Sequence, residues 1–561
     1  MSTASRGIHS LKFWINSNRP ILLAGLALAG MPLFIGSQFG SLDLYLLGAI
    51  LFVALAIFIL VCCSDGFYRI FTVVLSFFLF RYIAILKYAQ PLFDDPWSDL
   101  RTATFFADAN RVVPLPEMSN ARLMLYSRWP LSHLLAVTIS RVAGVRLLDI
   151  YTYFGPIIAF PSVLLVFLIA RDLFRDTGKA AISALILSVF SIPLFWQMQV
   201  GRQNLGITIL CVGLYAYVKA RRSRSRGALM LAVISFAILP LVHHLTALAA
   251  LATVTFAFAL DRIYWKSDRS PRFLLFVWVI TLLAWTVFQE GILIPALFYR
   301  SLALVFGLGE GGKFMSIQSR LRMHFDLYDL LAVVRVLCLM CAASLGLFLI
   351  IKRKMEFGAL LGALFLANGV LLLLSFVSAE VDERFALLLT LPTALLVACT
   401  WPKKRWLVVL LLTIIIVPTP FKLYETFYAA PVYVYDMHAS VEFRYGEFGK
   451  FRGEDILIIA QWNAKYTPKL PLLTDDYNGE VVQQYYDPAL IYFIASTDRH
   501  RVSYHPQDHL FVFFNRDYAA GRYGSVVLAD LERTISNTDL VYNDGSQVGY
   551  YVVRHSSNPP S

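Results

Sequence analysis

The chain alternates long apolar runs with short basic loops from residue 20 to residue 419. A transmembrane helix needs about 20 apolar residues to cross the hydrocarbon core of a bilayer, and by this criterion we expect about thirteen spans. The predicted spans are residues 20–37, 43–63, 68–88, 149–170, 180–196, 204–219, 227–243, 245–261, 273–290, 328–351, 357–378, 384–400 and 405–419. The pattern therefore predicts a multi-pass α-helical membrane protein whose first helix is retained.

The composition agrees with this class and excludes others. Of the 561 residues, 58% are hydrophobic and only 15% are charged, whereas a soluble chain has about a quarter of its residues charged. The net charge of +12 does not indicate a nucleic-acid partner, because the basic residues cluster between apolar runs, where membrane insertion places them. All six cysteines lie in or beside apolar segments, so no disulfide framework is expected in the polar C-terminal region.

The basic loops also predict the orientation of the chain. If the N-terminus is cytoplasmic, the basic loops at 219–224, 352–354 and 403–405 all lie in the cytoplasm. An odd number of spans then places the C-terminus outside. Residues 89–148 and 291–327 become long external loops, the second with a surface or re-entrant helix and a glycine-rich stretch typical of lids.

Composition changes near residue 420, after which the chain is polar and contains short β-type runs. These runs are residues 456–460, 490–494, 510–514, 525–528 and 548–553. We therefore expect a transmembrane domain of residues 1–425 and a small extracytoplasmic α/β domain of residues 426–561. The first external loop ends in an amphipathic stretch, Leu131 to Val145, expected to lie along the membrane surface.

The residues able to support chemistry lie on the predicted external side. They are Asp94, Asp95, Asp99, Glu117, Arg202, Gln203, Asn204, His243, His244, Lys313, Arg320, Arg322, Glu380, Asp382, Glu383 and Arg384. Group transfer from a lipid phosphate needs a carboxylate to deprotonate the acceptor hydroxyl and cations to hold the leaving phosphate. A transporter or flippase is disfavoured, because most predicted spans have interiors without charge and no internal repeat stands out.

Several of these residues also have a simpler structural explanation. Asp94 and Asp95 precede a proline, where aspartate commonly initiates a turn. Arg384 would serve as an interfacial anchor or pair with the neighbouring acids. His243 and His244 would point about 100° apart on one helix, so they share a ligand only if the helix breaks, which Pro240 permits.

The first external loop resembles a known enzyme motif. Asp95-Pro96-Trp97, followed after three residues by Arg101, resembles the Asp-Pro-Trp-Phe-Asn-Tyr-Arg motif of oligosaccharyltransferase catalytic subunits, with residues 102–110 as the helix that follows it. The order of spans and loops is similar to that family and to the wider GT-C class of glycosyltransferases. The resemblance implies that Asp95, with Asp94 as its rival, orients the acceptor or a metal, and that Trp97, Arg101 and Glu117 support the acceptor side.

Two further segments resemble other GT-C enzymes. Tyr126 to Leu131 is similar to a helix entry in this class, and Arg384 to Pro392 resembles the start of a helix in protein mannosyltransferases and aminoarabinose transferases. Two departures limit the likeness to oligosaccharyltransferases: residues 201–207 contain no carboxylate where a second acidic motif is expected, and the Trp-Trp-Asp-Tyr-Gly motif is absent. Glycosylation of asparagine in peptides is therefore disfavoured.

These observations predict an inverting GT-C glycosyltransferase that uses a polyprenyl-phosphate-linked sugar donor, with a glycan, lipid or protein acceptor. Asp95 or Asp94 is the expected general base, and the expected donor-phosphate ligands are Arg384, Arg202, His243, His244, Lys313 and Arg320. Tyr126, Glu380 and Asp382 are candidate supporting residues, and Mg²⁺ or Mn²⁺ at Asp95 is the metal-dependent alternative. Transfer of an oligosaccharide from a polyprenyl-diphosphate donor, as in oligosaccharyltransferases, is a variant of this prediction. A polysaccharide polymerase or ligase with a diphosphate donor, relying on His and Arg, is the second hypothesis.

Overall fold

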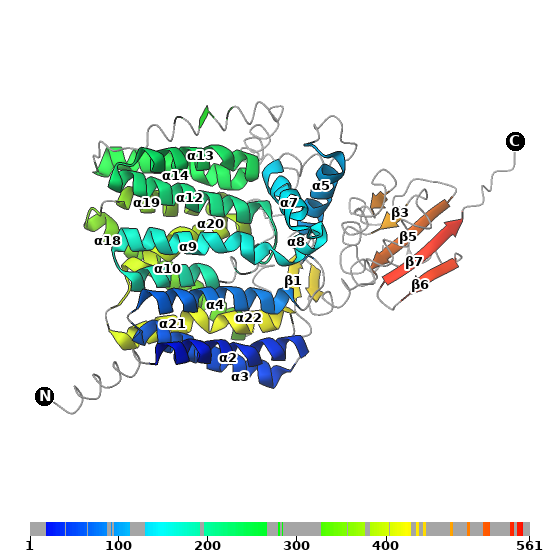
Figure 1. Ribbon diagram of the computed structural model, residues 1–561, viewed down its shortest axis with the longest axis horizontal. Helices are drawn as coiled ribbons and strands as arrows, with labels where there is room; N and C mark the ends of the chain where they lie inside the picture. Colours follow the sequence, from blue (N-terminus) through cyan, green and yellow to red (C-terminus); the bar gives the residue numbers. More distant parts are fainter. Residues whose placement is uncertain are drawn as a thin grey trace. The chain divides into compact units, whose positions relative to one another are not determined.

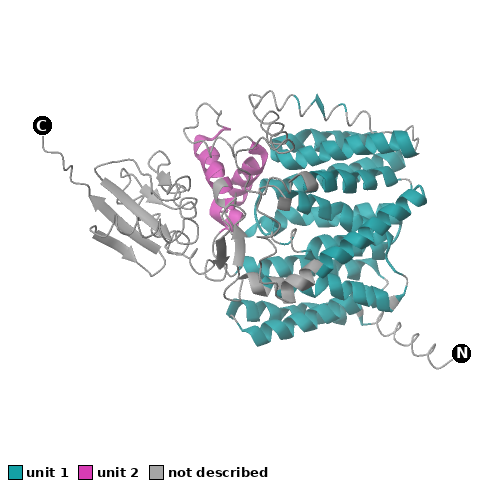
Figure 2. Ribbon diagram, turned by 180° about the vertical axis from the view of Figure 1, so that it is seen from behind, with its two compact units in different colours: residues 1–87, 153–424 teal, residues 88–152, 425–561 magenta. Residues whose placement is uncertain are grey.

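The computed structural model describes the helical part of the chain nearly throughout and the strands of its C-terminal region. The described residues are 18–39, 41–63, 65–86, 91, 95–112, 129–190, 194, 196–265, 276, 279–280, 283, 327–355, 357–375, 382–402, 404–427, 433–436, 441–444, 472–474, 491–493, 509–515, 539–543 and 547–553. They fall into two compact units, one of residues 1–87 with 153–424 and one of residues 88–152 with 425–561 (Figure 2). The domain boundary expected at residue 425 stays a prediction.

Unit 1 is a stack of helices that run side by side (Figure 1). Its elements are α2 (Arg19–Phe39), α3 (Leu42–Cys62), α4 (Gly66–Ile85), α9 (Gly155–Phe174), α10 (Thr177–Val189), α12 (Arg202–Ser223), α13 (Arg226–Val242), α14 (His244–Leu260), the π-helical turn η2 (Asp261–Trp265), α18 (Leu327–Lys352), α19 (Gly358–Ser375), α20 (Asp382–Cys399), α21 (Arg405–Ile416) and α22 (Pro418–Phe427). Within the described residues, six helices are long and apolar enough to cross a membrane, or seven if the bent pair Pro130–Ala143 and Leu147–Tyr153 is one span. The chain is thus a multi-pass membrane protein, and the expected total of thirteen spans stays a prediction.

Close packing in unit 1 depends on glycines at helix contacts. A Cβ added to Gly48 of α3 would lie 2.0 Å from the backbone nitrogen of Leu33 in α2, so only glycine permits this approach. In the interior, Phe52 of α3 and Phe80 of α4 meet edge to face with their ring centroids 5.6 Å apart. These contacts fix α2, α3 and α4 as one packed group.

The span predicted at residues 180–196 is wrong in its second half. Helix α10 ends at Val189, and Phe190 has extended backbone angles, φ −70° and ψ 139°. Pro193 follows three residues later, and helices usually end before a proline because its ring clashes with a helical predecessor. Residues 190–201, of which 190, 194 and 196–201 are described, form a segment that we call the connector.

Two other predicted spans have different limits in the structure. The span predicted at 405–419 consists of two consecutive helices, α21 and α22. The span predicted at 149–170 begins later, at α9, and residues 147–153 form the short helix α8 (Leu147–Tyr153). Of the predicted span at 273–290, only residues 276, 279, 280 and 283 lie in the described part of the chain.

Unit 2 contains α5 (Asp95–Ala109) and α7 (Pro130–Ala143). Helix α5 begins at Asp95, seven residues before the predicted helix at 102–110, so the Asp-Pro-Trp motif forms its first turn. Pro96 then occupies an early helical position, where its missing N–H costs no hydrogen bond. Helix α7 confirms the helix expected from the amphipathic stretch, and Gly144 ends it in a left-handed conformation, φ 66°.

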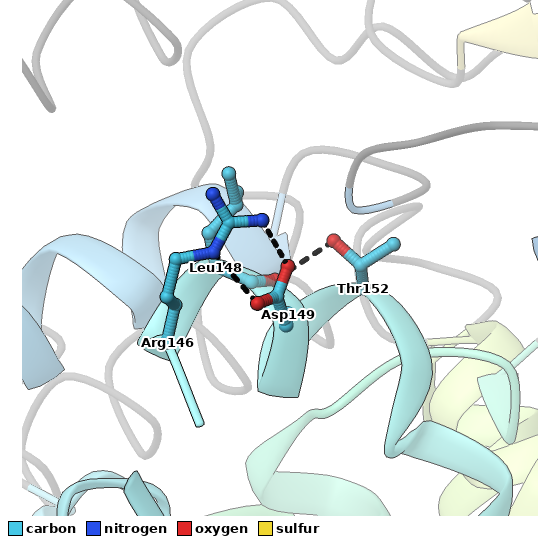
Figure 3. A network of polar contacts seen from close by, with 4 residues as sticks. All are labelled: Arg146, Leu148, Asp149 and Thr152. Carbon is cyan, nitrogen blue, oxygen red and sulfur yellow. Dashed lines mark hydrogen bonds and ion pairs between the residues drawn. The ribbon is translucent and has the colours of Figure 1, made fainter. Parts of the chain in front are cut away.

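Some polar contacts of unit 2 join two helices, and others involve a single helix. The Asp99 carboxylate of α5 lies 3.8 Å from His133 Nε2 of α7, and both side chains are buried. At the start of α8, Arg146 donates from Nε and Nη2 to the two carboxylate oxygens of Asp149, both at 2.7 Å, and Thr152 donates to the carbonyl of Leu148 at 2.8 Å (Figure 3). The Arg146–Asp149 pair is exposed and therefore contributes little to stability.

The C-terminal part of unit 2 contains seven described strands. They are β1 (Tyr433–Asp436), β2 (Val441–Arg444), β3 (Leu472–Thr474), β4 (Ile491–Phe493), β5 (His509–Asn515), β6 (Asp539–Asn543) and β7 (Gln547–Val553). Strands β1 and β2 form an antiparallel pair, and the other five form a mixed sheet in the order β4-β3-β5-β7-β6. The predicted runs at 490–494, 510–514 and 548–553 coincide with β4, β5 and β7. The runs at 456–460 and 525–528 lie outside the described residues, and the external α/β domain as a whole stays a prediction.

Candidate functional site: a cationic cluster at three helix N-termini

Four of the predicted phosphate ligands come together in unit 1. Arg202 is the first residue of α12, His244 is the first residue of α14, and Arg384 is the third residue of α20. The charges of Arg202 and Arg384 both interact with the imidazoles of His243 and His244. We call Arg202, His243, His244 and Arg384 the cationic cluster.

The N-terminal ends of three helices therefore meet at the cationic cluster. Gln203 of α12 donates from Nε2 to the carbonyl oxygen of Arg384 at 3.0 Å, which ties α12 to α20. A Cβ added to Gly206 of α12 would lie 3.3 Å from the Cβ of His243, which shows how closely α12 packs against the start of α14. A helix N-terminus carries unpaired N–H groups and the positive end of the helix dipole. Three of them at one place favour an anion.

The two adjacent histidines share this place because the helix breaks between them. His243 has extended backbone angles, φ −161° and ψ 118°, so α13 ends at Val242 and α14 starts at His244. The two rings lie 5.1 Å apart with an interplanar angle of 51°. A helix break of the kind that Pro240 permits is present, although Pro240 lies within α13 and the break falls three residues later.

Hydrogen bonds fix the proton position on His243. Its Nδ1 accepts the backbone N–H of Thr246 at 3.3 Å, which makes His243 the N-cap of α14, and the Thr246 hydroxyl lies 2.9 Å from the same atom. Because a backbone N–H can only donate, Nδ1 carries no proton. The neutral ring then bears its proton on Nε2, which makes that atom a hydrogen-bond donor.

Arg384 and Arg202 differ in their surroundings. The Arg384 guanidinium lies 5.4 Å from the ring centroid of Trp196, which belongs to the connector. The side chain of Asn204, in the first turn of α12, donates from Nδ2 to the carbonyl oxygens of Trp196 at 2.6 Å and Gln199 at 2.7 Å. Arg202 is almost fully buried, with 7% of its surface exposed. The connector thus supports one arginine through an aromatic face and is held in turn by α12.

The remaining predicted site residues lie elsewhere or outside the described part. Asp95 and Trp97 are in the first turn of α5, and Asp382 and Glu383 begin α20, but their side chains are not described. Arg101 is half-buried on α5. Asp94, Glu117, Tyr126, Lys313, Arg320, Arg322 and Glu380 lie outside the described residues. Among the described side chains, no three His, Cys, Asp or Glu residues are grouped so that they could hold a metal ion, and the metal at Asp95 stays a prediction.

Two charged residues in the spans were missed by the sequence analysis. Arg81 of α4 and Arg335 of α18 are completely buried, so these described residues depart from the expectation of mostly uncharged span interiors. A charged residue within an apolar run is itself a signal for function. Both arginines are visible in the sequence as charged residues of this kind. Trp196 and Thr246 carried no such signal, because their importance depends on contacts between elements.

Comparison with known proteins identifies the fold. No protein-family model matches the chain, and no curated protein matches it. The crystal structure of ArnT from Cupriavidus metallidurans bound to undecaprenyl phosphate is similar with a TM-score of 0.50 and 11% sequence identity, covering 88% of this chain and 99% of that one. The apo structure of the same protein gives a TM-score of 0.42 and 10% identity, over 86% of this chain and 97% of the other. The chain therefore has a fold similar to that of ArnT.

Proposed function

We propose that this protein is a GT-C glycosyltransferase that moves a sugar from a polyprenyl-phosphate-linked donor to an acceptor hydroxyl at the extracytoplasmic face of the membrane. The observation that carries the proposal is the cationic cluster, in which two arginines and two histidines lie at three helix N-termini. The likeness to ArnT, whose crystal structure contains undecaprenyl phosphate, supports a lipid phosphate as the anion.

The cluster has the properties that a donor phosphate requires. Arginine offers a planar set of N–H donors that matches phosphate oxygens, and His243 Nε2 adds a neutral donor. The helix N-termini supply fixed positive potential without the need for side chains to reorganise. We assign the donor phosphate to Arg384, Arg202, His243 and His244, and keep Lys313 and Arg320 as further proposed ligands.

The reaction needs one base and one stabilised leaving group. The carboxylate of Asp95, or of Asp94, removes the proton from the acceptor hydroxyl, and the oxygen forms a bond to the anomeric carbon of the sugar. The bond from that carbon to the donor phosphate oxygen breaks, and the polyprenyl phosphate leaves as an anion that the cluster stabilises. Attack from the face opposite the leaving group inverts the anomeric configuration, and no covalent enzyme intermediate forms. Trp97, Arg101, Glu117, Tyr126, Glu380 and Asp382 are proposed to support the acceptor side.

A polymerase or ligase with a polyprenyl-diphosphate donor is the second candidate. The grouping of both histidines with both arginines favours it, because such a reaction was expected to rely on His and Arg rather than on a carboxylate of the first loop. The two candidates differ in the effect of Asp95→Asn and in the preference for a monophosphate or a diphosphate lipid.

One experiment on the purified full-length protein in detergent tests both parts of the proposal. Binding of undecaprenyl phosphate is measured together with sugar transfer from a polyprenyl-monophosphate donor. Arg384→Ala should weaken binding at least about tenfold, since a charge-assisted hydrogen bond contributes about 1.5–3 kcal/mol. Asp95→Asn should leave binding unchanged and lower the transfer rate by about 10²–10⁴-fold, the usual contribution of a general base.

Arg226→Ala is the matched control for the arginine substitution. Arg226 is exposed and begins α13, whereas His243 follows the other end of that helix. The control should bind and transfer as the wild type does. Equal binding by Arg384→Ala and wild type would refute the phosphate site. Full transfer by Asp95→Asn alone would assign the base to Asp94, and full transfer by both Asp95→Asn and Asp94→Asn would refute the carboxylate base and favour the second candidate.

A further inference from the structure

Two arginines are completely buried within the helices of unit 1. Arg81 lies in α4 and Arg335 lies in α18, both helices apolar enough to span a membrane. A charged side chain within a membrane-spanning segment is costly unless other groups compensate its charge. The residues around the two guanidinium groups should therefore show how their charges are compensated and what role the two arginines have.

Both arginines bind the same helix end. Arg81 Nη1 donates to the carbonyl oxygen of Ser188 at 2.8 Å, and Arg335 Nη1 donates to that of Val189 at 3.4 Å. Ser188 and Val189 are the last residues of α10, where carbonyl groups lack helical partners and the dipole is negative. The end of α10 thus compensates the two cations. A helix C-terminus disfavours an anion, so the pair does not resemble a second phosphate site.

Within the described residues, Arg81 is hydrogen-bonded to the middle of the connector, whereas Arg335 meets only its first residue. Arg81 Nη2 donates to Oε1 of Gln197, a buried residue of the connector, and the Arg81 guanidinium lies 3.7 Å from the ring centroid of Phe77. Arg335 donates to Thr419 Oγ1 at 3.2 Å and to the carbonyl oxygen of Val189, and its guanidinium lies 5.1 Å from the ring centroid of Phe190. Arg81 therefore links the end of α10 to the middle of the connector.

The connector leads from Gln197 directly to the cationic cluster. Trp196, the residue before Gln197, carries the Arg384 guanidinium over its ring, and Asn204 holds the carbonyl oxygens of Trp196 and Gln199. On another side, a Cβ added to Gly155 of α9 would lie 2.2 Å from the carbonyl oxygen of Met198. The connector is therefore closely packed at Met198, and Gln197 lies between this contact and Trp196.

We propose that Arg81 is a positioning residue for the donor-phosphate site: through Gln197 it fixes the connector and thereby the Trp196 ring that orients Arg384. The inference rests on the proposed function, since it names the residue that arranges the same phosphate site. Arg81 itself contacts neither donor nor acceptor in this account. A displacement of about 1 Å in a positioned group can cost up to about 10²-fold in rate, which makes such an indirect role measurable.

Three variants separate positioning from general stability. Gln197→Ala removes the side-chain acceptor of Arg81 but keeps the hydrogen bond from Arg81 to the carbonyl oxygen of Ser188. Gln197→Glu keeps an oxygen for Arg81 and should restore function. Arg81→Lys keeps the charge but, as a single ammonium group, does not reproduce the fork that reaches Ser188 and Gln197 together.

The matched control is Thr419→Val. Thr419 Oγ1 donates to the carbonyl oxygen of Val189 at 2.7 Å and accepts from Arg335, so this variant disturbs the same end of α10 without touching Gln197. It should lower thermal stability while leaving undecaprenyl phosphate binding and the KM for the donor at wild-type values.

The measurements are binding of undecaprenyl phosphate, the KM and kcat of transfer, and hydrogen exchange of the peptide that covers residues 194–204. Gln197→Ala and Arg81→Lys should weaken binding of undecaprenyl phosphate and raise the donor KM about tenfold, because a small displacement of a phosphate-binding residue has effects of this order. Both variants should also speed hydrogen exchange in that peptide. Gln197→Glu should return all three readouts to within about twofold of wild type, because it retains the charge-assisted hydrogen bond.

The failures of the two proposals are distinguishable. If wild type does not bind undecaprenyl phosphate, or Arg384→Ala binds it as wild type does, the donor-phosphate site is wrong, and exchange in residues 194–204 still decides whether Arg81 orders the connector. If Arg384→Ala weakens binding but Gln197→Ala and Arg81→Lys bind and exchange as wild type does, the positioning role is overturned. Loss of binding in Thr419→Val equal to that in Gln197→Ala would likewise overturn it, because the effect would then follow from stability alone.

Discussion

At the scale of single residues, His243 has a structural task, and we propose that it also has a functional one. Its Nδ1 caps α14 by accepting the N–H of Thr246, and this leaves Nε2 as the donor available to a ligand. The apolar pattern predicted separate spans at 227–243 and 245–261, but histidine is not among the residues favoured at N-caps, so nothing in the sequence indicated that His243 caps the second helix. Pro240 suggested a break, but the local hydrogen bonds at His243 determine its position.

The two tasks of His243 can be separated by substitution. His243→Ser retains a good N-cap and loses the long donor, whereas His243→Ala loses both, and an N-cap contributes about 1 kcal/mol. We expect both variants to bind undecaprenyl phosphate more weakly, and only His243→Ala to unfold at a lower temperature. Thermal unfolding and ligand titration check this. A His243→Ser variant that binds as tightly as wild type would show that the imidazole does not contact the phosphate.

At the scale of elements, the site depends on how closely α12 approaches the break between α13 and α14. Gly206 makes this approach possible, because a Cβ there would lie 3.1 Å from Thr246 Oγ1 and 3.3 Å from His243 Cβ. Two turns further along α12, Gly213 has a similar closeness to Phe236 of α13, at 3.1 Å. The two glycines therefore offer a matched pair of positions on one helix.

Valine at each position should destabilise the protein but should affect the site differently. Added bulk in a close-packed contact typically costs about 1–3 kcal/mol, so Gly206→Val and Gly213→Val should both unfold at lower temperature. Only Gly206→Val moves α12 away from His243, and only this variant should lose affinity for undecaprenyl phosphate. Thermal unfolding and binding are measured side by side. Equal losses of affinity in both variants would contradict the account.

The first and last residues of the helices could be predicted where a long apolar run determines them. They could not be predicted where contacts with other parts of the chain determine them. The helices at α2, α3 and α14 lie close to the predicted spans, since a long apolar run has few alternatives in a membrane. The short α10 and the connector were not predicted, because residues 190–196 are apolar enough to continue a span. Their conformation depends on partners distant in sequence, among them Arg81 and Asn204.

At the scale of the whole molecule, the apolar runs were sufficient to predict a multi-pass helical membrane protein, and its fold is similar to that of ArnT. The grouping of Arg202, His243, His244 and Arg384 was anticipated only as a set of residues on one side of the membrane. That three helix N-termini meet there is a property of tertiary packing, which no local pattern encodes. The cytoplasmic N-terminus and the extracytoplasmic C-terminal domain remain predictions from the distribution of basic loops.

The central claim is that the cationic cluster holds the phosphate of a polyprenyl carrier. The most direct measurement is an experimental structure of the full-length protein in the presence of undecaprenyl phosphate. We predict that the phosphate lies within hydrogen-bond distance, about 3 Å, of Arg384 or Arg202, with His243 Nε2 directed at the same group. A phosphate bound away from both arginines and from His243 would contradict the assignment of the site.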